Sequence, residues 1–432
     1  MDKVLIIAFV NFLLYVKTIG YRYVSDDLPV SQRPKKEGWW QFLDVLNGEA
    51  RSNIYFDRIL TILIHTATAI ALYFAFGKSD VSFIAALLFS VNPINNQCSV
   101  WISGRGYALP ALFTLLCMIF PYASVVFIWA SCFFPLGYLF SSVLVFVNPM
   151  LALFLPVGWI AHRGEFFKRV KSKSSGEMYD ENKKLDFARI VIATKTIGWY
   201  LSHIILPMKN TFYHSFMQSE AGSGRDKAKR IDIWFFIGLT AIVSSVVFLI
   251  TQPFTLRSFA IIWFFFSIAP FCNLIRMSQE IAERYAYVPC VAVMFLLSSY
   301  LVGYPLIIAF LLGVMTCKTF FYIEAYQDNY YLIEHSRISD KDAWFAWHLA
   351  GWLRWDADSH KEALRMWVKA ILIHPNESKV LWNVAVCLRI LGRDDEAKEY
   401  FERAIKNAPK GQEKEWEAIA SEWKKGKLSM RI

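Results

Sequence analysis

The sequence predicts an all-helical protein in two parts, a polytopic membrane domain followed by a short domain of helical repeats. The chain is 56% hydrophobic and only 19% charged, whereas soluble proteins carry about 25% charged residues. Apolar windows recur from Val4 to Phe321, and most approach the roughly 20 residues of helix that cross a hydrocarbon core. Beyond residue 325 the chain is polar, charged and helix-periodic. We therefore expect one domain at 1–325 and a second at 326–432.

The membrane domain is expected to contain about eleven transmembrane helices. Most apolar segments stand apart, at about 4–19, 57–77, 81–92, 232–251, 256–272, 285–301 and 303–323. Between Tyr107 and Ala161 the chain is almost continuously apolar, and its prolines divide it into roughly three or four further spans. Residues 185–206 mix charged and apolar side chains, which favours a helix lying in the interface. The first segment lacks a small-residue cleavage site, so it predicts a retained signal anchor.

The C-terminal domain contains an internal repeat of 34 residues. The positions that align are Ala363 with Ala397, Trp367 with Phe401, Ala370 with Ala404, Pro375 with Pro409 and Gly351 with Ala385. This period, with small and large residues alternating, is typical of tetratricopeptide repeats. It predicts two repeats at about 344–377 and 378–411 and a capping helix from Gln412 to Lys424. Repeats of this kind form extended binding surfaces, so we expect them to bind an acceptor protein or a partner subunit.

Charge and cysteine content narrow the class of protein further. The formal net charge is +10, and basic residues cluster between Arg163 and Lys173 beside an apolar segment. Such clusters usually contact anionic lipid or phosphate head groups. A nucleic-acid partner is not expected, because no recognisable nucleic-acid-binding motif accompanies the charge. The seven cysteines are scattered without a Cys-x-x-Cys pair, which favours small buried apolar residues over a disulfide framework or a zinc site.

Two adjacent carboxylates, Asp26 and Asp27, follow the first apolar segment. At the boundary between water and lipid, a carboxylate can meet a lipid-linked substrate and still be hydrated enough to ionise. Carboxylates at or within a membrane are costly, so the pair is a candidate functional site. The alternative is that both are solvated loop acids without a role.

Two further polar segments interrupt the apolar pattern. The first runs from Asn92 to Arg105 and reads NPINNQCSVWISGR, and the second runs from Pro270 to Pro289 and contains Glu283 and Arg284. Arg105 and Arg284 are candidates to bind an anionic group. The alternatives are head-group snorkelling for Arg105 and an ion pair joining two spans for Glu283 and Arg284. His65, within the second apolar segment, is either a site residue or a hydrogen-bonded buried histidine.

These segments resemble the motifs of the transmembrane O-mannosyltransferases that carry C-terminal tetratricopeptide repeats, a family of C-type glycosyltransferases. In the family, the first outer loop carries an acidic pair, a stretch like HP…HTEAVAWIxGR follows, and AERxxYxP comes later after PxxN. The matching positions here are Asp26-Asp27, Asn92 to Arg105, Ala282 to Pro289, and Pro270 with Asn273. With the repeats, the resemblance spans nearly the whole chain.

The resemblance implies a transferase that moves a sugar from a polyprenyl-phosphate donor to a Ser/Thr or glycan hydroxyl. Asp26 or Asp27 would be the base, with Asp27 slightly favoured, and Arg105 and Arg284 would hold the donor phosphate. Glu283 would orient Arg284 or act as a second acid. The remaining site residues on this view are Asn92, Asn95, Gln97 and His65. The polyprenyl-phosphate sugar is the donor, no other cofactor is assigned, and a divalent metal stays open.

Three positions depart from the family pattern. Asn92, Asn95 and Gln97 replace two histidines and a glutamate. Amides can hydrogen-bond a sugar or a phosphate, but they cannot transfer protons. The alternative function is therefore a catalytically inactive membrane scaffold, or a subunit that binds a lipid-linked sugar and recruits partners through its repeats.

An odd number of spans would place the two termini on opposite sides of the membrane. With the N-terminus cytoplasmic, the acidic pair, the other two motif segments and the repeats would lie on the outer or lumenal face. A bacterial inner membrane and the endoplasmic reticulum both fit this multi-pass topology. It places much basic charge outside, against the usual positive-inside tendency, and the expected lipid phosphate would account for that charge.

Overall fold

The computed structural model describes residues 2–27, 31, 45–46, 52–123, 142–146, 187–215, 230–274, 281–408 and 412–426. Within these ranges the regular structure is helical and contains no strand, as the sequence predicts. The chain forms two compact units. Unit 1 comprises Met1–Asn210 and Ile231–Tyr331, and unit 2 comprises Thr211–Arg230 and Leu332–Ile432.

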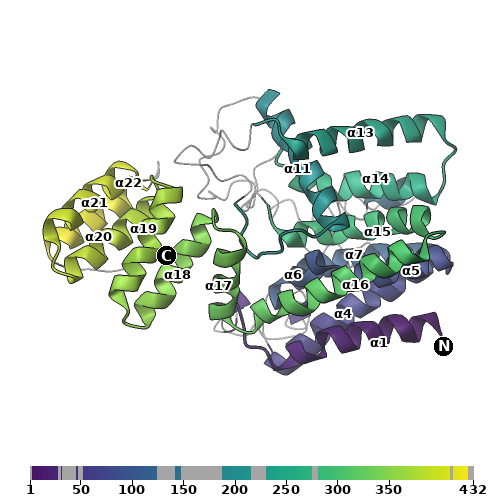
Figure 1. Cartoon of the computed structure of the whole chain (residues 1–432), viewed down its shortest axis with the longest axis horizontal. Helices are drawn as coiled ribbons and strands as arrows, with labels where there is room; N and C mark the ends of the chain where they lie inside the picture. Colours follow the sequence, from purple (N-terminus) through teal and green to yellow (C-terminus); the bar gives the residue numbers. More distant parts are fainter. Residues whose placement is uncertain are drawn as a thin grey trace. The chain divides into compact units, whose positions relative to one another are not determined.

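Unit 1 is a bundle of helices, most of which run side by side in Figure 1. Its main helices are α1 (Lys3–Tyr15), α4 (Ile54–Ala75), α5 (Asp80–Val91), α7 (Arg105–Ile119), α11 (Phe187–Ile205), α13 (Ile233–Thr251), α14 (Leu256–Ile268), α15 (Tyr287–Leu301) and α16 (Pro305–Tyr322). Shorter pieces join them, among them α6 (Asn96–Ser99), η1 (Val16–Gly20), η2 (Pro93–Asn95), η3 (Ile102–Gly104), η7 (Ala269–Phe271), η8 (Glu283–Ala286) and η9 (Ile323–Tyr326). Each apolar segment that the sequence separates from its neighbours therefore forms a helix.

Among the described residues, six helical segments of unit 1 are long and apolar enough to cross a membrane, as expected for a membrane protein. They are Lys3–Gly20, Ile54–Ala75, Ile102–Ile119, Ile233–Thr251, Glu283–Leu301 and Pro305–Tyr326, and Asp80–Val91 and Leu256–Phe271 are shorter apolar helices. Most of the stretch from 124 to 186, which was expected to hold further spans, lies outside the described residues. The total of about eleven spans therefore stays a prediction.

Polar side chains mark where several of these helices begin. Asn53 accepts a hydrogen bond from the Tyr55 backbone at the start of α4, and the Ser79 and Ser82 side chains form a capping box at the start of α5. Thr255 begins α14 with a second capping box. These side chains satisfy backbone N–H groups that have no partner within the helix, and so they fix the ends of the apolar segments.

The charged helix α11 packs closely against α13. The two backbones approach at Gly198 and Gly238, where an added Cβ would collide with the backbone of the other helix. Lys195 of α11 is buried and pairs with Asp232, the N-cap of α13, at 2.5 Å. Its charge is therefore matched within the protein. The interfacial position expected for residues 185–206 remains a prediction.

The helices of unit 1 place the polar motif residues at one end. Lys3 pairs with Asp80 at 2.5 Å, which brings the starts of α1 and α5 together. Tyr322 at the end of α16 donates to Glu283 at 2.9 Å, just before α15 begins. We call the end that holds Glu283 the carboxylate end, and the end that holds Asp80 the opposite end.

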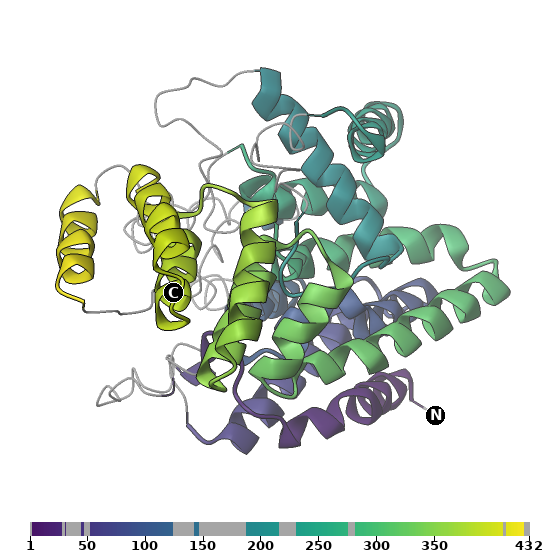
Figure 2. The same ribbon diagram turned by 60° about the vertical axis from the view of Figure 1, so that its left-hand side comes forward.

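Unit 2 contains the helical repeats. Its helices are α17 (Asn329–Ser339), which begins at the border with unit 1, α18 (Trp344–Asp356), α19 (His360–Ile373), α20 (Ser378–Ile390), α21 (Asp394–Lys406) and α22 (Glu413–Lys424). Figure 2 shows the yellow-green and yellow helices as a series of helical layers. The two helix pairs fall within the predicted repeats. Trp423 of α22 stacks on Phe401 at 4.7 Å, which is the contact expected of a capping helix.

One part of the predicted membrane domain belongs to unit 2 instead. Residues Thr211–Arg230 group with the repeats, although the sequence places them before the boundary at 326. Ser215 donates from its backbone N and its hydroxyl to the buried Asp340 carboxylate at 2.7–2.8 Å. The Tyr213 ring packs edge-on against Phe345. A hydrogen bond between residues 125 positions apart leaves no local signal in the sequence.

Gly351 is required where α18 meets α19. A Cβ there would collide with the ring of Trp367, which is fully buried and donates to the His348 carbonyl at 3.0 Å. Gly351→Ala should therefore destabilise the repeats by about 1–3 kcal/mol through overpacking. Hydrogen exchange of α18 and α19 in the full-length protein measures the loss. Gly313→Ala, whose methyl meets open space, is the control, and equal protection in both variants would contradict the prediction.

The repeats should also lose stability in acid. His348 is buried, and this burial lowers its pKa to about 3, with a smaller contribution from Lys379. The unfolded chain, with a histidine pKa near 6.5, takes up this proton first. The free energy of unfolding of the repeats therefore has its full value above about pH 6.5 and decreases as the pH drops toward 3, by about 2 kcal/mol at pH 5. Urea unfolding of the repeats at pH 7.5 and 5 should show this loss, and His348→Gln should lessen it while His360→Gln should not.

Candidate functional site

The acidic pair lies at the carboxylate end, in a segment that is tied to the last part of unit 1. The Arg22 backbone N donates to the Gln327 carbonyl at 2.9 Å, and the Ser25 N donates to the Asn329 side chain at 2.6 Å. Ser25 has a φ of 52°, so the chain turns sharply just before the two acids. The pair is thus positioned by contacts far away in the sequence.

The two acids differ in their surroundings. Asp27 is fully buried, and its Oδ1 accepts hydrogen bonds from the Ser103 backbone N at 3.1 Å and the Ser103 hydroxyl at 2.8 Å. Asp26 is exposed and interacts electrostatically with Arg284. Of the two, Asp26 is therefore the one accessible from outside the protein, and Asp27 holds the turn that contains Ser103.

That turn depends on a glycine. Gly104 follows Ser103, and a Cβ on it would collide with the Gln97 carbonyl oxygen. The close approach holds η3 against α6, so the start of α7 is set beside the segment that contains Gln97. The glycine in Ser103-Gly104-Arg105 is therefore required by this close packing.

Arg105 is a buried link between α7 and α4. Its Nη2 pairs with the Asp57 carboxylate at 2.9 Å and donates to the Asp57 carbonyl at 2.7 Å, while its Nε donates to Thr61 Oγ1 at 2.9 Å. Arg105 and Asp57 both have side chains with no exposed surface. Because Asp57 and Thr61 occupy the donors of its guanidinium, the structure favours a role for Arg105 in stabilising the fold over contact with a donor phosphate.

Arg284 lies among aromatic rings. Its guanidinium carbon is 5.3 Å from the centroid of Trp101, 5.7 Å from that of Tyr107 and 5.0 Å from that of Tyr285. Its backbone N and Nη1 both donate to Gln97 Oε1, at 3.2 and 3.3 Å. Arginine over aromatic faces is held by cation–π attraction. Gln97 and these rings orient the arginine at the carboxylate end.

Glu283 has partners of its own. Tyr322 donates to its Oε2 at 2.9 Å, and the Asn210 amide donates to its Oε1 at 3.2 Å. The Tyr326 hydroxyl continues this chain by donating to the Tyr322 hydroxyl at 3.2 Å. Glu283 thus joins the end of α16 to the start of α15, next to Arg284 in the sequence.

Asn92 and Asn95 support the backbone. Asn92 donates to the Ile204 carbonyl at 2.8 Å and accepts from the Ile94 backbone N at 3.1 Å, which caps η2. Asn95 donates to the Phe89 carbonyl at 2.8 Å. Both amides are fully buried. The structure therefore brings Gln97 to Arg284, whereas it directs Asn92 and Asn95 toward main-chain groups.

His65 is a hydrogen-bonded core residue. Its Nδ1 lies 2.9 Å from the Tyr287 hydroxyl and its Nε2 lies 3.3 Å from the Ser90 carbonyl. Its ring packs edge-on against Tyr15, and it has no exposed surface. The sequence leaves open whether His65 is a site residue or a hydrogen-bonded buried histidine, and this geometry fits the second interpretation.

Sequence reasoning missed Asp57 and the aromatic rings around Arg284. The signal for Asp57 was present, since an acid in the first turn of an apolar helix must find a cation or a helix dipole to offset its burial. Trp101 and Tyr285 lie inside the two motif segments and Tyr107 lies two residues after the first, but the convergence of their rings on one arginine needs the fold. Among the described residues, no group of three His, Cys, Asp or Glu side chains is placed to hold a metal ion.

Comparison with known proteins supports the repeat domain alone. The family described as tetratricopeptide repeat matches residues 378–410, which is the second predicted repeat. The chain matches no curated protein and no solved structure. Repeats of this family commonly mediate protein–protein contacts, which is consistent with a protein partner for unit 2.

Proposed function

We propose that the protein is a membrane glycosyltransferase, which moves a sugar from a polyprenyl-phosphate donor to a protein or glycan hydroxyl at the carboxylate end. The observation that carries the proposal is that the exposed carboxylate of Asp26 interacts electrostatically with the buried guanidinium of Arg284. A base and a cation so placed are what this reaction needs. The motif resemblance favours mannose as the sugar, and the outer or lumenal face as the side on which transfer takes place.

In the proposed reaction, Asp26 takes the proton of the acceptor hydroxyl as the oxygen attacks the anomeric carbon. The bond from that carbon to the phosphate oxygen breaks on the opposite face, so the configuration inverts. Arg284 stabilises the negative charge left on the polyprenyl phosphate. Gln97 and the aromatic rings hold the arginine in place, and Glu283 fixes the backbone beside it.

The remaining candidate residues take supporting parts in this proposal. Asp27 holds the turn at Ser103, so it positions Asp26 rather than reacting itself. The ion pair of Arg105 with Asp57 joins α7 to α4. The repeats would bind the acceptor protein, which the tetratricopeptide match supports.

The experiment that tests the function is a transfer assay with the purified full-length protein. A radiolabelled polyprenyl-phosphate mannose is the donor, and Ser/Thr-containing peptides are the acceptors. The double variant Asp26→Asn with Asp27→Asn should abolish transfer. Asp80→Asn, an exposed acid at the opposite end, is the matched control. Unchanged transfer by the double variant would refute the mechanism.

A second candidate function is a scaffold or a subunit that binds a lipid-linked sugar without turning it over. It is favoured by the amides at Asn92 and Asn95, which hydrogen-bond to main-chain carbonyls, and by the repeat match. Both candidates share the Arg284 phosphate site. Turnover of any sugar donor by the purified protein excludes the second candidate, whereas donor binding without turnover supports it.

A further inference from the structure

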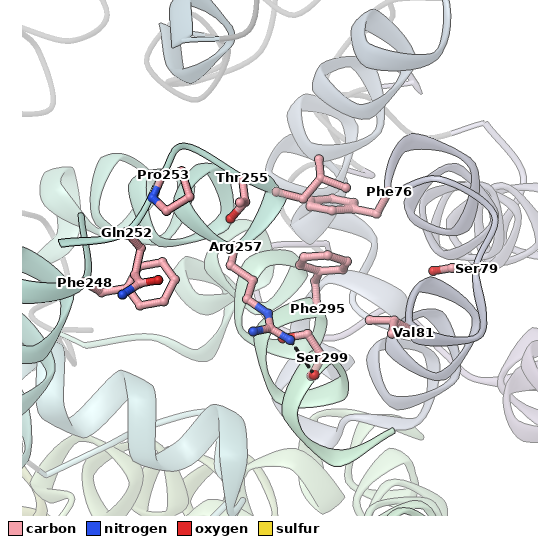
Figure 3. Close-up of a pocket in the computed structure, with 11 residues that line it drawn as sticks. Phe76, Ser79, Val81, Phe248, Gln252, Pro253, Thr255, Arg257, Phe295 and Ser299 are labelled. Carbon is pink, nitrogen blue, oxygen red and sulfur yellow. Dashed lines mark hydrogen bonds between the residues drawn. The ribbon is translucent and has the colours of Figure 1, made fainter. Parts of the chain in front are cut away.

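A cavity lies at the opposite end of unit 1, away from Asp26 and Arg284. It has a volume of about 470 Å³ and is bounded by the end of α4, the start of α5, the end of α13, the start of α14 and the last turns of α15 (Figure 3). Phe76, Phe248 and Phe295 contribute aromatic surface, and Gln252, Thr255 and Arg257 add polar groups. The cavity thus has an apolar wall and a polar margin.

The apolar wall is made by side chains from three helices. Phe76 is 1% exposed, and its ring centroid lies 4.3 Å from that of Phe295. Phe248 approaches from α13, as Figure 3 shows. A wall of this composition fits a hydrocarbon chain, because burial of apolar surface is favourable and needs no polar partner.

Arg257 supplies the only full charge among the described residues that line the cavity. Its Nη2 donates to the Ser299 carbonyl at 3.0 Å, and its guanidinium carbon lies 4.8 Å from the centre of the Tyr300 ring. Neither contact neutralises it, and no ion pair with a carboxylate is formed by Arg257 in the described part of the chain. A guanidinium in this state suits a phosphate oxygen.

The surroundings of the cavity favour a lipid over a soluble anion. Helix α13 borders it and presents apolar side chains outward, with Val246 50%, Val247 53% and Ile250 79% exposed. This helix is also one of the six that could cross a membrane. The cavity therefore adjoins a surface suited to hydrocarbon at the level where helices begin and end, which is where phospholipid head groups lie.

We propose that this cavity binds one anionic phospholipid. Its head-group phosphate contacts Arg257, and one acyl chain lies against Phe76, Phe248 and Phe295. A net negative head group is favoured over a zwitterionic one, because among the described residues that line the cavity Arg257 carries the single uncompensated charge and none is a carboxylate that could receive a head-group ammonium. The proposal is independent of the transferase function, which rests on residues at the carboxylate end.

The test is lipid binding by the full-length protein in detergent micelles, followed by native mass spectrometry. Phosphatidylglycerol and phosphatidylcholine with the same acyl chains are the probes. The wild type should retain phosphatidylglycerol in preference, and Arg257→Gln should weaken this binding about five- to tenfold. Lys78→Gln, an exposed cation at the same end outside the cavity lining, should have no effect.

A second variant tests the acyl-chain part of the site. Val81→Trp fills the cavity from α5 and leaves the charge of Arg257 in place, so it should also displace phosphatidylglycerol. Equal retention of the two lipids by the wild type, or unchanged binding in both cavity variants, would overturn the proposal. An equal loss in Lys78→Gln would likewise overturn it, because it would indicate a general attraction to the basic surface.

Discussion

Arg105→Met is expected to destabilise unit 1 by about 3–5 kcal/mol, the largest effect on stability among these substitutions. The substitution removes one half of an ion pair in which neither side chain has exposed surface. The Asp57 carboxylate would then be buried without its cation, and the Thr61 hydroxyl would lose its donor from Nε. The free energy of unfolding of the full-length protein, measured in mixed micelles with increasing dodecyl sulfate, reports the loss.

The matched control replaces both partners. Asp57→Leu combined with Arg105→Met leaves no unpaired charge, and it should recover most of the lost stability, since apolar replacement of a buried pair is often neutral. If Arg105→Met alone unfolds like the wild type but binds the polyprenyl-phosphate donor more weakly, Arg105 has the phosphate-binding role that the motif resemblance implies.

Local pattern is sufficient to predict the helices. The apolar segments expected at 57–77 and 303–323 correspond to α4 and α16 within a few residues, because apolar runs and polar caps are both features of neighbouring residues. The repeats are equally local, since the 34-residue period places Trp367 and Phe401 at equivalent positions. The tetratricopeptide match at 378–410 confirms the second of the two predicted repeats.

For the candidate site, the sequence predicts which types of residue are present but not which contacts they make. Asp57 and Arg105 are 48 positions apart, and their ion pair engages an arginine that the motif alone places at the candidate phosphate site. Asp26 and Asp27 are neighbours with the same local sequence, but the contact with Ser103 buries one and leaves the other exposed. Such distinctions arise from tertiary contacts, which sequence periodicity does not encode.

Asp26→Asn is expected to lower kcat for sugar transfer by about 10²–10⁴-fold, because the amide cannot accept the proton of the acceptor hydroxyl. Donor affinity should change little, since Arg284 would hold the phosphate. The folded state should be unaffected, because the Asp26 side chain is exposed. Initial rates with radiolabelled donor, together with a donor-binding measurement, separate the two effects.

Asp27→Asn is the informative comparison for that experiment. The amide oxygen of asparagine can still accept from the Ser103 backbone N and hydroxyl, as Asp27 Oδ1 does. The turn should therefore persist, and kcat should fall much less than in Asp26→Asn. A larger loss in Asp27→Asn, with unfolding like that of the wild type, would make Asp27 the base, as the sequence pattern slightly favours. The Asp27 carboxylate would then have to become exposed when substrate binds, because a base must lie within hydrogen-bonding reach of the hydroxyl that it deprotonates.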